Sequence, residues 1–385
     1  MAKARQRLRA DELATQAEIG DWISGIPETI IMQPTTLCNL DCTYCYLSDR
    51  KKKRDMSPQV ARAIASSIPA ICPQFGSLEV VWHGGEPLAI GSGGLVELLE
   101  PFESLRQAGQ IRHTIQTNAT LINDEWCDLF MIYNISVGVS IDGPRDVNSN
   151  RVDRRGFPIF DRIIAGIETM KSHGIPFSVI AVIDHESVGR AREILDFLTE
   201  LECPLVGFNM EEKEGVNIHR RTPTMAQARN FWQDVFLWSK SNPQMRVREV
   251  DRLLDFLSLG QAARHADGKH DLIPTVAWNG DVVVLSPELL GTCAPLYGDF
   301  IVGNVLTDPL PAILNRAFKF SYVREFQLGI EQCKATCEFF AYCQGSHAGN
   351  RYFEHGTFTA TETEHCRTST QALILALHDI ASNGL

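Results

Sequence analysis

The sequence lacks two features that would settle the class of the protein at once: a long apolar run and an excess of basic residues. Its longest apolar stretches, such as the one around Leu78 to Trp82, fall well short of the roughly 20 residues that a membrane-spanning helix needs. The 385 residues include 36 Lys+Arg against 47 Asp+Glu, and the net charge of −11 argues against broad binding to a phosphate backbone. We therefore expect neither a membrane nor a nucleic acid as a partner.

A secretory signal is missing as well. Met1 to Ala10 is basic, but Asp11, Glu12 and Glu18 follow where a signal would continue with an apolar segment. We therefore expect a cytoplasmic protein. The composition, 44% hydrophobic and 22% charged, is that of a globular chain and excludes disorder, collagen and coiled coil. In a reducing compartment the 11 cysteines are expected to be metal ligands or buried apolar residues rather than disulfides.

Three of the cysteines form a C-x3-C-x2-C pattern, Cys38, Cys42 and Cys45, directly after a strand-like apolar run. Thiolates are the usual ligands of iron–sulfur clusters, and a cubane held by only three of them leaves one iron open to an outside ligand. Three buried structural cysteines or part of a zinc site are the alternatives. They are less favoured because zinc sites usually supply four closed ligands.

A second group lies near the C-terminus and consists of Cys333, Cys337, Cys343 and Cys366. Four thiolates complete the ligand set of a cluster, but they satisfy tetrahedral zinc equally well. The remaining four have no close cysteine neighbour. Cys72, Cys127 and Cys203 are interpreted as buried small residues, whereas Cys293, in a Gly-Thr-Cys-Ala-Pro loop, stays unassigned.

Apolar strand-like runs alternate with helical patterns in the first half of the chain, which is typical of a βα-repeat fold with a parallel sheet. The predicted strands are Thr29–Gln33, Leu78–His83, His113–Thr117, Ser136–Ile141, Phe177–Ile183 and Leu205–Asn209. The predicted helices between them include Pro58–Ile68, Asp124–Ile132, Phe160–Ser172 and Val188–Leu198. Beyond Glu211 the pattern changes to helices over Met225–Ser239 and Arg246–Leu259, a hairpin at Asn279-Gly280, the cysteine-rich tail and a last helix over Ser369–Ile380. We interpret this part as a second, smaller module.

Polar motifs follow the predicted strands at their carboxyl ends, where such folds bind ligands. Paired glycines let the backbone approach a ligand closely, and hydroxyl, amide, carboxylate and guanidinium groups add hydrogen-bonding partners. The motifs are Trp82-His83-Gly84-Gly85-Glu86-Pro87, Gln116-Thr117-Asn118 and Ser140-Ile141-Asp142-Gly143-Pro144, with Arg151 a few residues on. Together they describe a pocket for a zwitterionic ligand that carries a sugar.

The combination of C-x3-C-x2-C, Gly-Gly-Glu-Pro, Gln-Thr-Asn and Ser-x-Asp-Gly-Pro resembles the radical S-adenosylmethionine (SAM) superfamily, in the branch with a C-terminal SPASM module. Longer phrases are similar to peptide maturases of the GrrM/OscB type, which are related to cyclophane-forming enzymes. These phrases are Val206 to Glu212, Pro287 to Leu290, Tyr297 to Phe300 and Gly303 to Val305.

This resemblance implies an α/β fold, a partial (β/α)6 TIM barrel of the radical SAM type with a SPASM-like cysteine-rich module. The expected parts are an N-terminal extension over 1–27, the barrel over 28–215, a helical connection over 216–270 and the module over 271–385.

The resemblance also implies a [4Fe–4S] cluster held by Cys38, Cys42 and Cys45, whose fourth iron is chelated by SAM. Gly84, Gly85, Glu86 and Pro87 match the segment that receives the methionine amino group, Ser140 and Arg151 match contacts to ribose or carboxylate, and Tyr44 matches an aromatic residue near adenine. Gln116, Asn118 and Asp142 complete the predicted SAM pocket.

The sequence departs from the family pattern in its C-terminal module. Leu285 and His347 stand where cysteines are expected, and the usual C-x2-C is C-x3-C. The resemblance therefore implies one auxiliary [4Fe–4S] cluster, on Cys333, Cys337, Cys343 and Cys366, and the loss of the inner one. A mixed site that uses Cys293 or His347 is the alternative.

The departure from the family pattern also affects the general base, the carboxylate that takes a proton from the substrate. Relatives that mature sulfatases carry a carboxylate where this chain has Ser286, so Glu288, Glu211 and Glu212 are the nearest candidates by motif. Closing a carbon–carbon bond onto an aromatic ring requires the ring to lose a proton and an electron, which suits a carboxylate and a cluster near the cavity. The alternative is that these glutamates are structural or exposed.

The implied function is the crosslinking of an aromatic ring carbon to a β-carbon in a ribosomally made precursor peptide, with flavodoxin or ferredoxin as electron donor. Thioether formation, epimerisation and anaerobic sulfatase maturation are alternative enzymatic functions, and a non-catalytic iron–sulfur or zinc protein is an alternative of another class. The basic run Arg50 to Arg54 is a solvated loop or a docking site for an acidic leader peptide.

Overall fold

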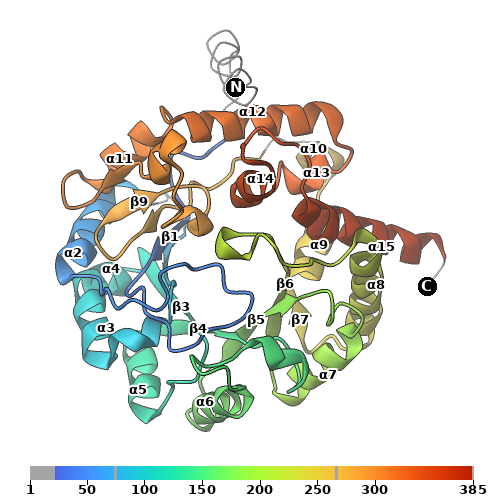
Figure 1. Ribbon diagram of the computed structural model, residues 1–385, viewed down its shortest axis with the longest axis horizontal. Coiled ribbons are helices and arrows are strands. Elements are labelled where there is room, and N and C mark those ends of the chain that lie inside the picture. The colour runs from blue at the N-terminus through green and yellow to red at the C-terminus, as the bar shows by residue number, and fades with distance from the viewer. Residues whose placement is uncertain (1–21, 73–75, 265–267, 384–385) are drawn as a thin grey trace.

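The computed structural model describes residues 22–72, 76–264 and 268–383, which form a ring of strands surrounded by helices (Figure 1). One ten-stranded sheet has the order β10-β9-β8-β1-β2-β3-β4-β5-β6-β7, and the pairs from β8-β1 through β6-β7 are parallel. The strands are β1 (Thr29–Met32), β2 (Leu78–Trp82), β3 (Ile111–Thr117), β4 (Ile135–Ser140), β5 (Phe177–Ile183), β6 (Leu205–Met210), β7 (Arg246–Val247), β8 (Thr275–Val276), β9 (Asp281–Val283) and β10 (Gly303–Asn304).

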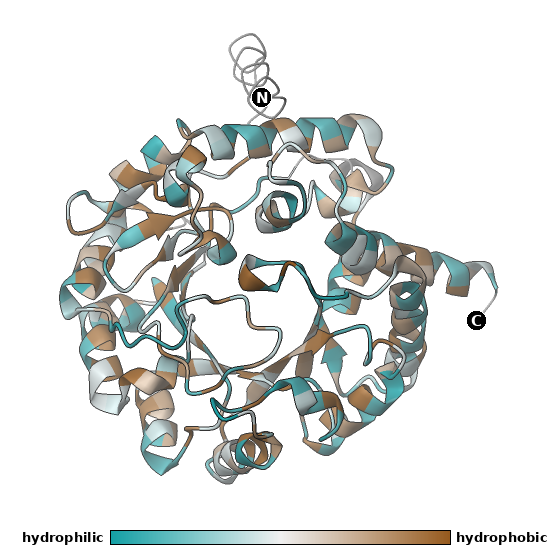
Figure 2. Ribbon diagram, in the orientation of Figure 1, coloured by the Kyte–Doolittle hydropathy of each residue, from teal (hydrophilic) through white to brown (hydrophobic). Residues whose placement is uncertain are grey.

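The predicted partial barrel is confirmed. All six predicted strands are present as β1 to β6, and their ends differ from the predicted ones by no more than two residues. The helices are α2 (Pro58–Ser67), α3 (Ser92–Leu99), α4 (Glu103–Gln107), α5 (Asp124–Ile132), α6 (Phe160–Ser172), α7 (Ala191–Glu200), α8 (Met225–Ser241), α9 (Arg248–Ser258), α10 (Gln261–Arg264), α11 (Leu310–Ala317), α12 (Ser321–Thr336), α13 (Phe340–Cys343), α14 (Ala348–His355) and α15 (Ala372–Ser382). They carry both hydrophobic and hydrophilic segments, as expected for helices with one buried face (Figure 2).

Two predicted helices begin later than the pattern indicated. Arg246 and Val247 pair with β6 as the short strand β7, so α9 starts only at Arg248. The residues from Val188 to Arg190 belong to a turn closed by the side chain of Asp184, and α7 starts at Ala191. In both places a backbone hydrogen-bond partner outside the helix decides the boundary.

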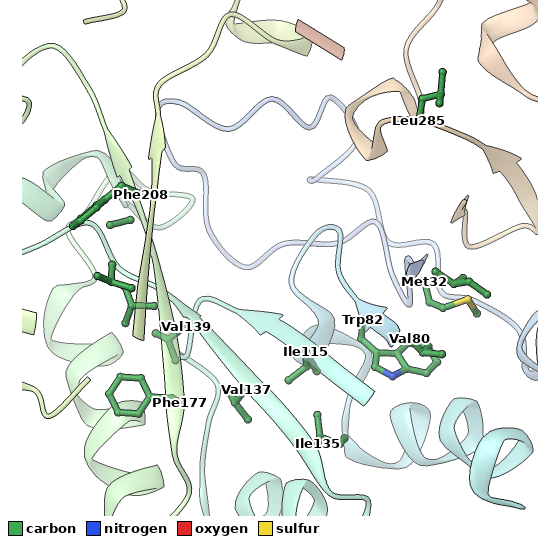
Figure 3. Packing of buried hydrophobic residues seen from close by; sticks show 14 of the residues in the cluster. Met32, Val80, Trp82, Ile115, Ile135, Val137, Val139, Phe177, Phe208 and Leu285 are labelled. Atoms are coloured by element: carbon green, nitrogen blue, oxygen red, sulfur yellow. The ribbon is translucent and has the colours of Figure 1, made fainter. Parts of the chain in front are cut away.

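The two faces of the barrel sheet differ in polarity. Buried apolar side chains such as Val80, Trp82 and Ile115 project from neighbouring strands (Figure 3), and Trp82 packs edge-on against Phe102, 6.0 Å between ring centroids, outside the sheet. Successive side chains point to opposite faces, and several of the alternate residues are polar, such as Glu79, which accepts from Thr114, and Gln116, which donates to Ser140. Their hydrogen bonds run from strand to strand, so the lumen of the barrel carries polar groups that a ligand can contact.

The C-terminal part extends the barrel sheet. Strand β8 pairs in parallel with β1, and the predicted hairpin at Asn279-Gly280 turns it into the antiparallel β9. Further along, α15 packs against α8, where Asp379 accepts hydrogen bonds from Arg229 and Gln233. The last helix follows a π-helical segment, η8 (Cys366–Gln371), which carries the last cysteine of the chain.

Residues 1–21, most of the predicted N-terminal extension, lie outside the residues that the structure describes. The predicted domain boundaries at 27, 215 and 270 stay predictions. Within the ranges that the structure describes, no helix is both long and apolar enough to span a bilayer.

Candidate functional site

The first three cysteines share one loop at the carboxyl end of β1. The loop is fixed by backbone hydrogen bonds, from Cys38 N to Arg50 O at 2.8 Å and from Thr43 N to Asn150 O at 2.9 Å. Burial raises the pKa of Cys38 to about 12 and that of Cys42 to about 11, and neighbouring thiols add to both shifts; burial also raises the pKa of Cys45. Thiols held together in this way ionise only when a cation compensates their charge, as an iron–sulfur cluster does.

Gly85 seats the Gly-Gly-Glu-Pro turn against this loop. Its φ is +63°, and a Cβ there would lie 2.6 Å from the carbonyl oxygen of Leu37. The next residue, Glu86, donates its backbone N–H to the same oxygen at 2.8 Å. Only glycine fits this backbone conformation and this approach, so the turn and the cysteine loop form one rigid unit.

Glu86 is a buried anchor between β2 and β3. Its carboxylate accepts hydrogen bonds from Thr117 Oγ1 at 2.6 Å, Asn118 N at 2.8 Å and Leu88 N at 3.1 Å. Burial raises the pKa of Glu86 to about 7, although these donors oppose the shift. Both carboxylate oxygens are engaged within the protein, and the predicted amino-group contact of this turn, from Gly84 to Pro87, stays a prediction.

Asn118 connects the end of β3 to the cysteine loop. Its Nδ2 donates to Asn39 Oδ1 at 2.9 Å and lies 3.9 Å from Cys38 Sγ. On the lumen face, Gln116 donates to Ser140 Oγ at 2.8 Å. Gly138 leaves space for this amide, since a Cβ there would lie 2.2 Å from Gln116 Oε1.

Asp142, Arg151 and Tyr44 form a buried group beside the cysteines. Arg151 donates two hydrogen bonds to Asp142, at 2.9 and 3.0 Å, and its guanidinium carbon lies 5.4 Å from the centroid of the Tyr44 ring. The Tyr44 hydroxyl donates to Asp142 at 2.7 Å, and Val182 N donates at 3.0 Å. Asp142 therefore positions Arg151 and Tyr44, two of the residues predicted to contact SAM.

The three candidate bases occupy two different environments. Glu211 is buried and paired with Arg220, which also lies 4.0 Å from Asp184. Burial raises the pKa of Glu211, and Arg220 opposes the shift. Arg220 thus engages Oε1 of this carboxylate, while Oε2 is buried without a hydrogen-bond partner.

Glu212 and Glu288 meet in a carboxylate cluster that also contains Glu214. Asn350 Nδ2 donates to Glu212 and lies 3.5 Å from Glu214 Oε1, and Ser286 Oγ donates to Glu288. Burial and then Glu212 raise the pKa of Glu214 well above its usual range. Burial raises the pKa of Glu288 to about 7.

The carboxylate cluster, Glu212, Glu214 and Glu288, adjoins the cysteine loop through Tyr46. Burial and then these carboxylates raise the pKa of Tyr46, the residue after Cys45. The segment between β6 and α8 crosses the centre of the ring in Figure 1 and touches this loop, because Val216 N donates to Tyr46 O at 3.4 Å. The sequence analysis missed Glu214 and Tyr46. The local signal for Glu214 was the run of acidic residues from Glu211 to Glu214, and Tyr46 had none.

The C-terminal cysteines come together from four places on helices α12, α13 and η8. Cys333 and Cys366 are buried, and Cys337 and Cys343 are half-buried. Burial raises the pKa of Cys366 to about 11, and Cys343 and Cys337 act in the same direction, so the thiols lie within electrostatic range of one another. Donors reach three of the sulfurs, from Arg351 Nη2 to Cys333 at 3.4 Å, from Gly345 N to Cys343 at 3.5 Å and from Gln371 Nε2 to Cys366 at 3.6 Å.

Leu285 and His347, which stand where the family pattern has cysteines, and the unassigned Cys293 lie in three different environments. Leu285 is buried in the apolar core, apart from the labelled strand residues in Figure 3. His347 is exposed and packs against His365, 5.8 Å between ring centroids. Cys293 is exposed and lines a cavity of about 310 Å³ beside Arg50, Arg54 and Trp278.

Among the described residues, no three His, Cys, Asp or Glu side chains converge on a point as they would around a single metal ion.

A family model described as the radical SAM superfamily matches residues 32–198, the part that contains the cysteine loop and strands β2 to β5. The chain is a radical SAM enzyme. It is 36% identical over 362 residues to an uncharacterised protein of Synechocystis, covering 90% of each chain, and the two belong to one family. A serine-type anaerobic sulfatase-maturating enzyme of Bacteroides thetaiotaomicron is 29% identical over 47% of this chain and 46% of its own.

Two solved structures resemble this radical SAM enzyme over nearly its full length. Native anSMEcpe with bound AdoMet has a TM-score of 0.73 at 20% identity, covering 92% of this chain and 98% of its own. SuiB of Streptococcus suis bound to the precursor peptide SuiA has a TM-score of 0.65 at 18% identity, covering 94% and 80%. The fold, including the SPASM-type C-terminal part, is that of these enzymes.

Proposed function

We propose that this radical SAM enzyme is a peptide maturase of the GrrM/OscB type that crosslinks an aromatic ring carbon of a ribosomal precursor peptide to a nearby β-carbon. The observation that carries the proposal is the carboxylate cluster of Glu212, Glu214 and Glu288 beside the cysteine loop, at the mouth of a polar barrel. The likeness to SuiB bound to its precursor peptide supports a peptide as substrate.

The residues present fit a SAM-binding cluster. Three mutually close thiols on a rigid loop, Cys38, Cys42 and Cys45, would hold a [4Fe–4S] cluster and leave one iron open. When bound, the cluster and SAM supply a 5′-deoxyadenosyl radical that removes a hydrogen atom from the peptide. The protein orients the peptide and excludes water from the lumen.

The remaining predicted pocket residues have positions that suit SAM. Tyr44 and Arg151, fixed by Asp142, would face adenine and the carboxylate or ribose, and Gln116 with Ser140 would add contacts from the lumen wall. Asn118 and the turn from Gly84 to Pro87 border the cysteine loop, where the amino group is expected.

The base in our proposal is Glu288 or Glu212. After the carbon–carbon bond forms, the ring must release one proton, and a carboxylate with a pKa of about 7 is suited to accept it at neutral pH. Glu211 is the weakest of the three candidates because Arg220 occupies it. We expect Glu288→Gln or Glu212→Gln to slow crosslinking roughly 10²- to 10⁴-fold and Glu211→Gln to have little effect, with SAM cleavage retained in all three.

One auxiliary [4Fe–4S] cluster on Cys333, Cys337, Cys343 and Cys366 would accept the electron that the ring loses. The inner cluster is absent in this proposal, since Leu285 lies in the core and His347 packs on His365. Flavodoxin or ferredoxin would deliver the electron that starts each turnover, in the cytoplasm.

The function is tested by incubating the reduced, reconstituted enzyme and SAM with an aromatic-rich precursor peptide encoded beside its gene. A crosslink removes two hydrogen atoms and leaves every cysteine thiol free to react with iodoacetamide. A thioether removes two hydrogens but blocks a thiol, and epimerisation in D₂O adds one deuterium. Either of these results, or formylglycine on a sulfatase peptide, contradicts the crosslink.

Sulfatase maturation is the second candidate because of the likeness to the maturase of Bacteroides thetaiotaomicron. Ser286 in place of a carboxylate disfavours it. The structure offers Glu288 as a substitute, since it accepts a hydrogen bond from Ser286. A sulfatase-derived peptide in the same assay separates the two functions.

A further inference from the structure

A buried arginine stands among the four C-terminal cysteines. Arg351, on α14, is 2% exposed and donates hydrogen bonds to Phe358 O at 3.0 Å, Gly345 O at 2.5 Å and Cys333 Sγ at 3.4 Å. In the part of the chain that the structure describes, no Asp or Glu carboxylate lies within ion-pair distance of it.

A guanidinium buried without a counter-charge is costly. Among its contacts in the described residues, the group able to carry a negative charge is the sulfur of Cys333, 3.4 Å from Nη2. Thiolates bound to iron are therefore the counter-charge that this site provides, and the arginine fits an anionic cluster better than four neutral thiols.

The surrounding backbone is shaped around the guanidinium. A Cβ at Gly329, on α12, would lie 1.9 Å from Arg351 Nη1, and one at Gly345 would lie 3.3 Å from Nη2. The guanidinium carbon lies 5.0 Å from the centroid of the Phe326 ring, which closes another side. Two glycines and an aromatic ring thus hold the cation in a single orientation, with one N–H directed at sulfur.

We propose that Arg351 is a positioning residue that stabilises the reduced form of the auxiliary cluster and so raises its reduction potential. Reduction adds one negative charge, and a fixed cation with an N–H···S hydrogen bond favours the more negative state. The inference rests on the proposed auxiliary cluster. It explains how that cluster is able to take one electron from the crosslinked ring while the ring proton goes to a carboxylate.

The test first removes the SAM-binding cluster, so that its signal does not overlap with that of the auxiliary cluster. In a Cys38→Ala/Cys42→Ala/Cys45→Ala background, only the auxiliary cluster remains to be titrated by EPR, without any SAM chemistry. Arg351→Met is expected to lower the ratio of reduced to oxidised cluster at least tenfold at the wild-type midpoint, which is about 59 mV for a one-electron couple. A shift no larger than that of the control would overturn the inference.

The control is Arg367→Gln, which removes the same charge next to Cys366 in sequence but from a side chain that is 52% exposed and paired with Glu362. Water screens that charge, so a small shift is expected.

If Arg351→Met does not retain iron, Arg351→Lys and Arg351→Gln carry the test. Lysine keeps the charge and glutamine keeps only an N–H donor, so the inference requires a higher potential for lysine. Equal potentials would overturn it. Iron missing already from the triple-alanine parent would instead refute the auxiliary cluster and leave peptide modification to be judged by its own assay.

Discussion

The two cysteine groups differ in how the protein surrounds them. The loop of Cys38, Cys42 and Cys45 is held by backbone hydrogen bonds, by a glycine turn and by Arg154, which donates to Cys38 O at 3.0 Å, while the side-chain donor beside a sulfur is the neutral amide of Asn118, 3.9 Å from Cys38 Sγ. The group of Cys333, Cys337, Cys343 and Cys366 is supported by a buried guanidinium and a glutamine. The first arrangement leaves a ligand position open and the second supplies four thiols and charge compensation, as expected for radical generation and electron acceptance respectively.

The largest expected effect follows from removing the three thiols of the Cys38, Cys42 and Cys45 loop. In the Cys38→Ala/Cys42→Ala/Cys45→Ala variant we expect SAM cleavage to fall below detection and the iron content to fall from about eight to about four per chain. Iron analysis and 5′-deoxyadenosine assays on anaerobically reconstituted protein measure both. About twelve irons falling to about eight would show a third cluster built with Cys293 or His347, and about four falling to none would leave the C-terminal group with zinc or empty.

Removing cysteines of the C-terminal group should separate SAM cleavage from peptide crosslinking, which the triple-alanine variant abolishes together. With Cys333→Ser and Cys366→Ser combined, SAM cleavage without peptide should stay within about threefold of the wild type, because the cysteine loop keeps its own contacts. The crosslinked product should fall by at least about a hundredfold, since the ring electron has no acceptor. Mass spectrometry of the peptide and 5′-deoxyadenosine assays are run on the same samples, and an undiminished product would break the proposed division of labour.

Substitution of two glycines tests how rigid their surroundings are: Gly85 lies beside the Cys38 loop and Gly349 beside Ser286. A Cβ at Gly85 would meet the backbone oxygens of Leu37 and Thr35 at 2.6 and 2.8 Å, whereas a Cβ at Gly349 would meet Ser286 Oγ, a side chain able to rotate, at 2.5 Å. We expect Gly85→Ala to cost about 2–3 kcal/mol and most of the SAM-site iron, and Gly349→Ala to cost about 1 kcal/mol.

Denaturant unfolding and iron content measure the two effects. The matched control is Gly109→Ala, which has a similar φ of +69° but no neighbouring atom within 4 Å. If Gly85→Ala is no worse than this control, the close approach to the cysteine loop is not what holds the turn.

The last prediction concerns the pH dependence of stability, and it rests on Glu288 in the carboxylate cluster. The pKa of Glu288 is raised from 4.5 to about 7 in the folded chain, so in that window the folded state binds a proton that the unfolded state has lost. Stability should therefore fall as pH rises from about 4.5 to about 7, by at most roughly 1.4 kcal/mol per pH unit.

Glu288→Gln should remove this part of the slope, measured as the thermal midpoint at several pH values, whereas the exposed Glu97→Gln should leave the slope unchanged. A slope that survives in Glu288→Gln would assign the buried proton to another group.

The sequence predicted the parallel strands well because alternation of buried residues is local, as in Phe177–Ile183, where the predicted and observed bounds agree. The cysteine spacing likewise indicated both groups. What lies far apart in the chain stayed hidden: no pattern connects Arg351 with Cys333, Glu214 with Asn350, or β8 with β1. Asp142 shows a further limit, since a carboxylate at a strand end is compatible both with a ligand contact and with the role observed here, a brace for Arg151 and Tyr44.

The continuous hydrogen bonding from β10 through β8 to β1 has a mechanical consequence. The C-terminal part and the barrel share this sheet, so moving one against the other would break the hydrogen bonds between β8 and β1, whereas the loops at the carboxyl ends of the strands are not bound by them. The segment from Glu211 to Thr224 lies across the centre of the ring, is joined to its surroundings by Lys213–Glu364 and by Arg220, 4.0 Å from Asp184, and carries the exposed apolar side chains of Val216 and Ile218 (Figure 1).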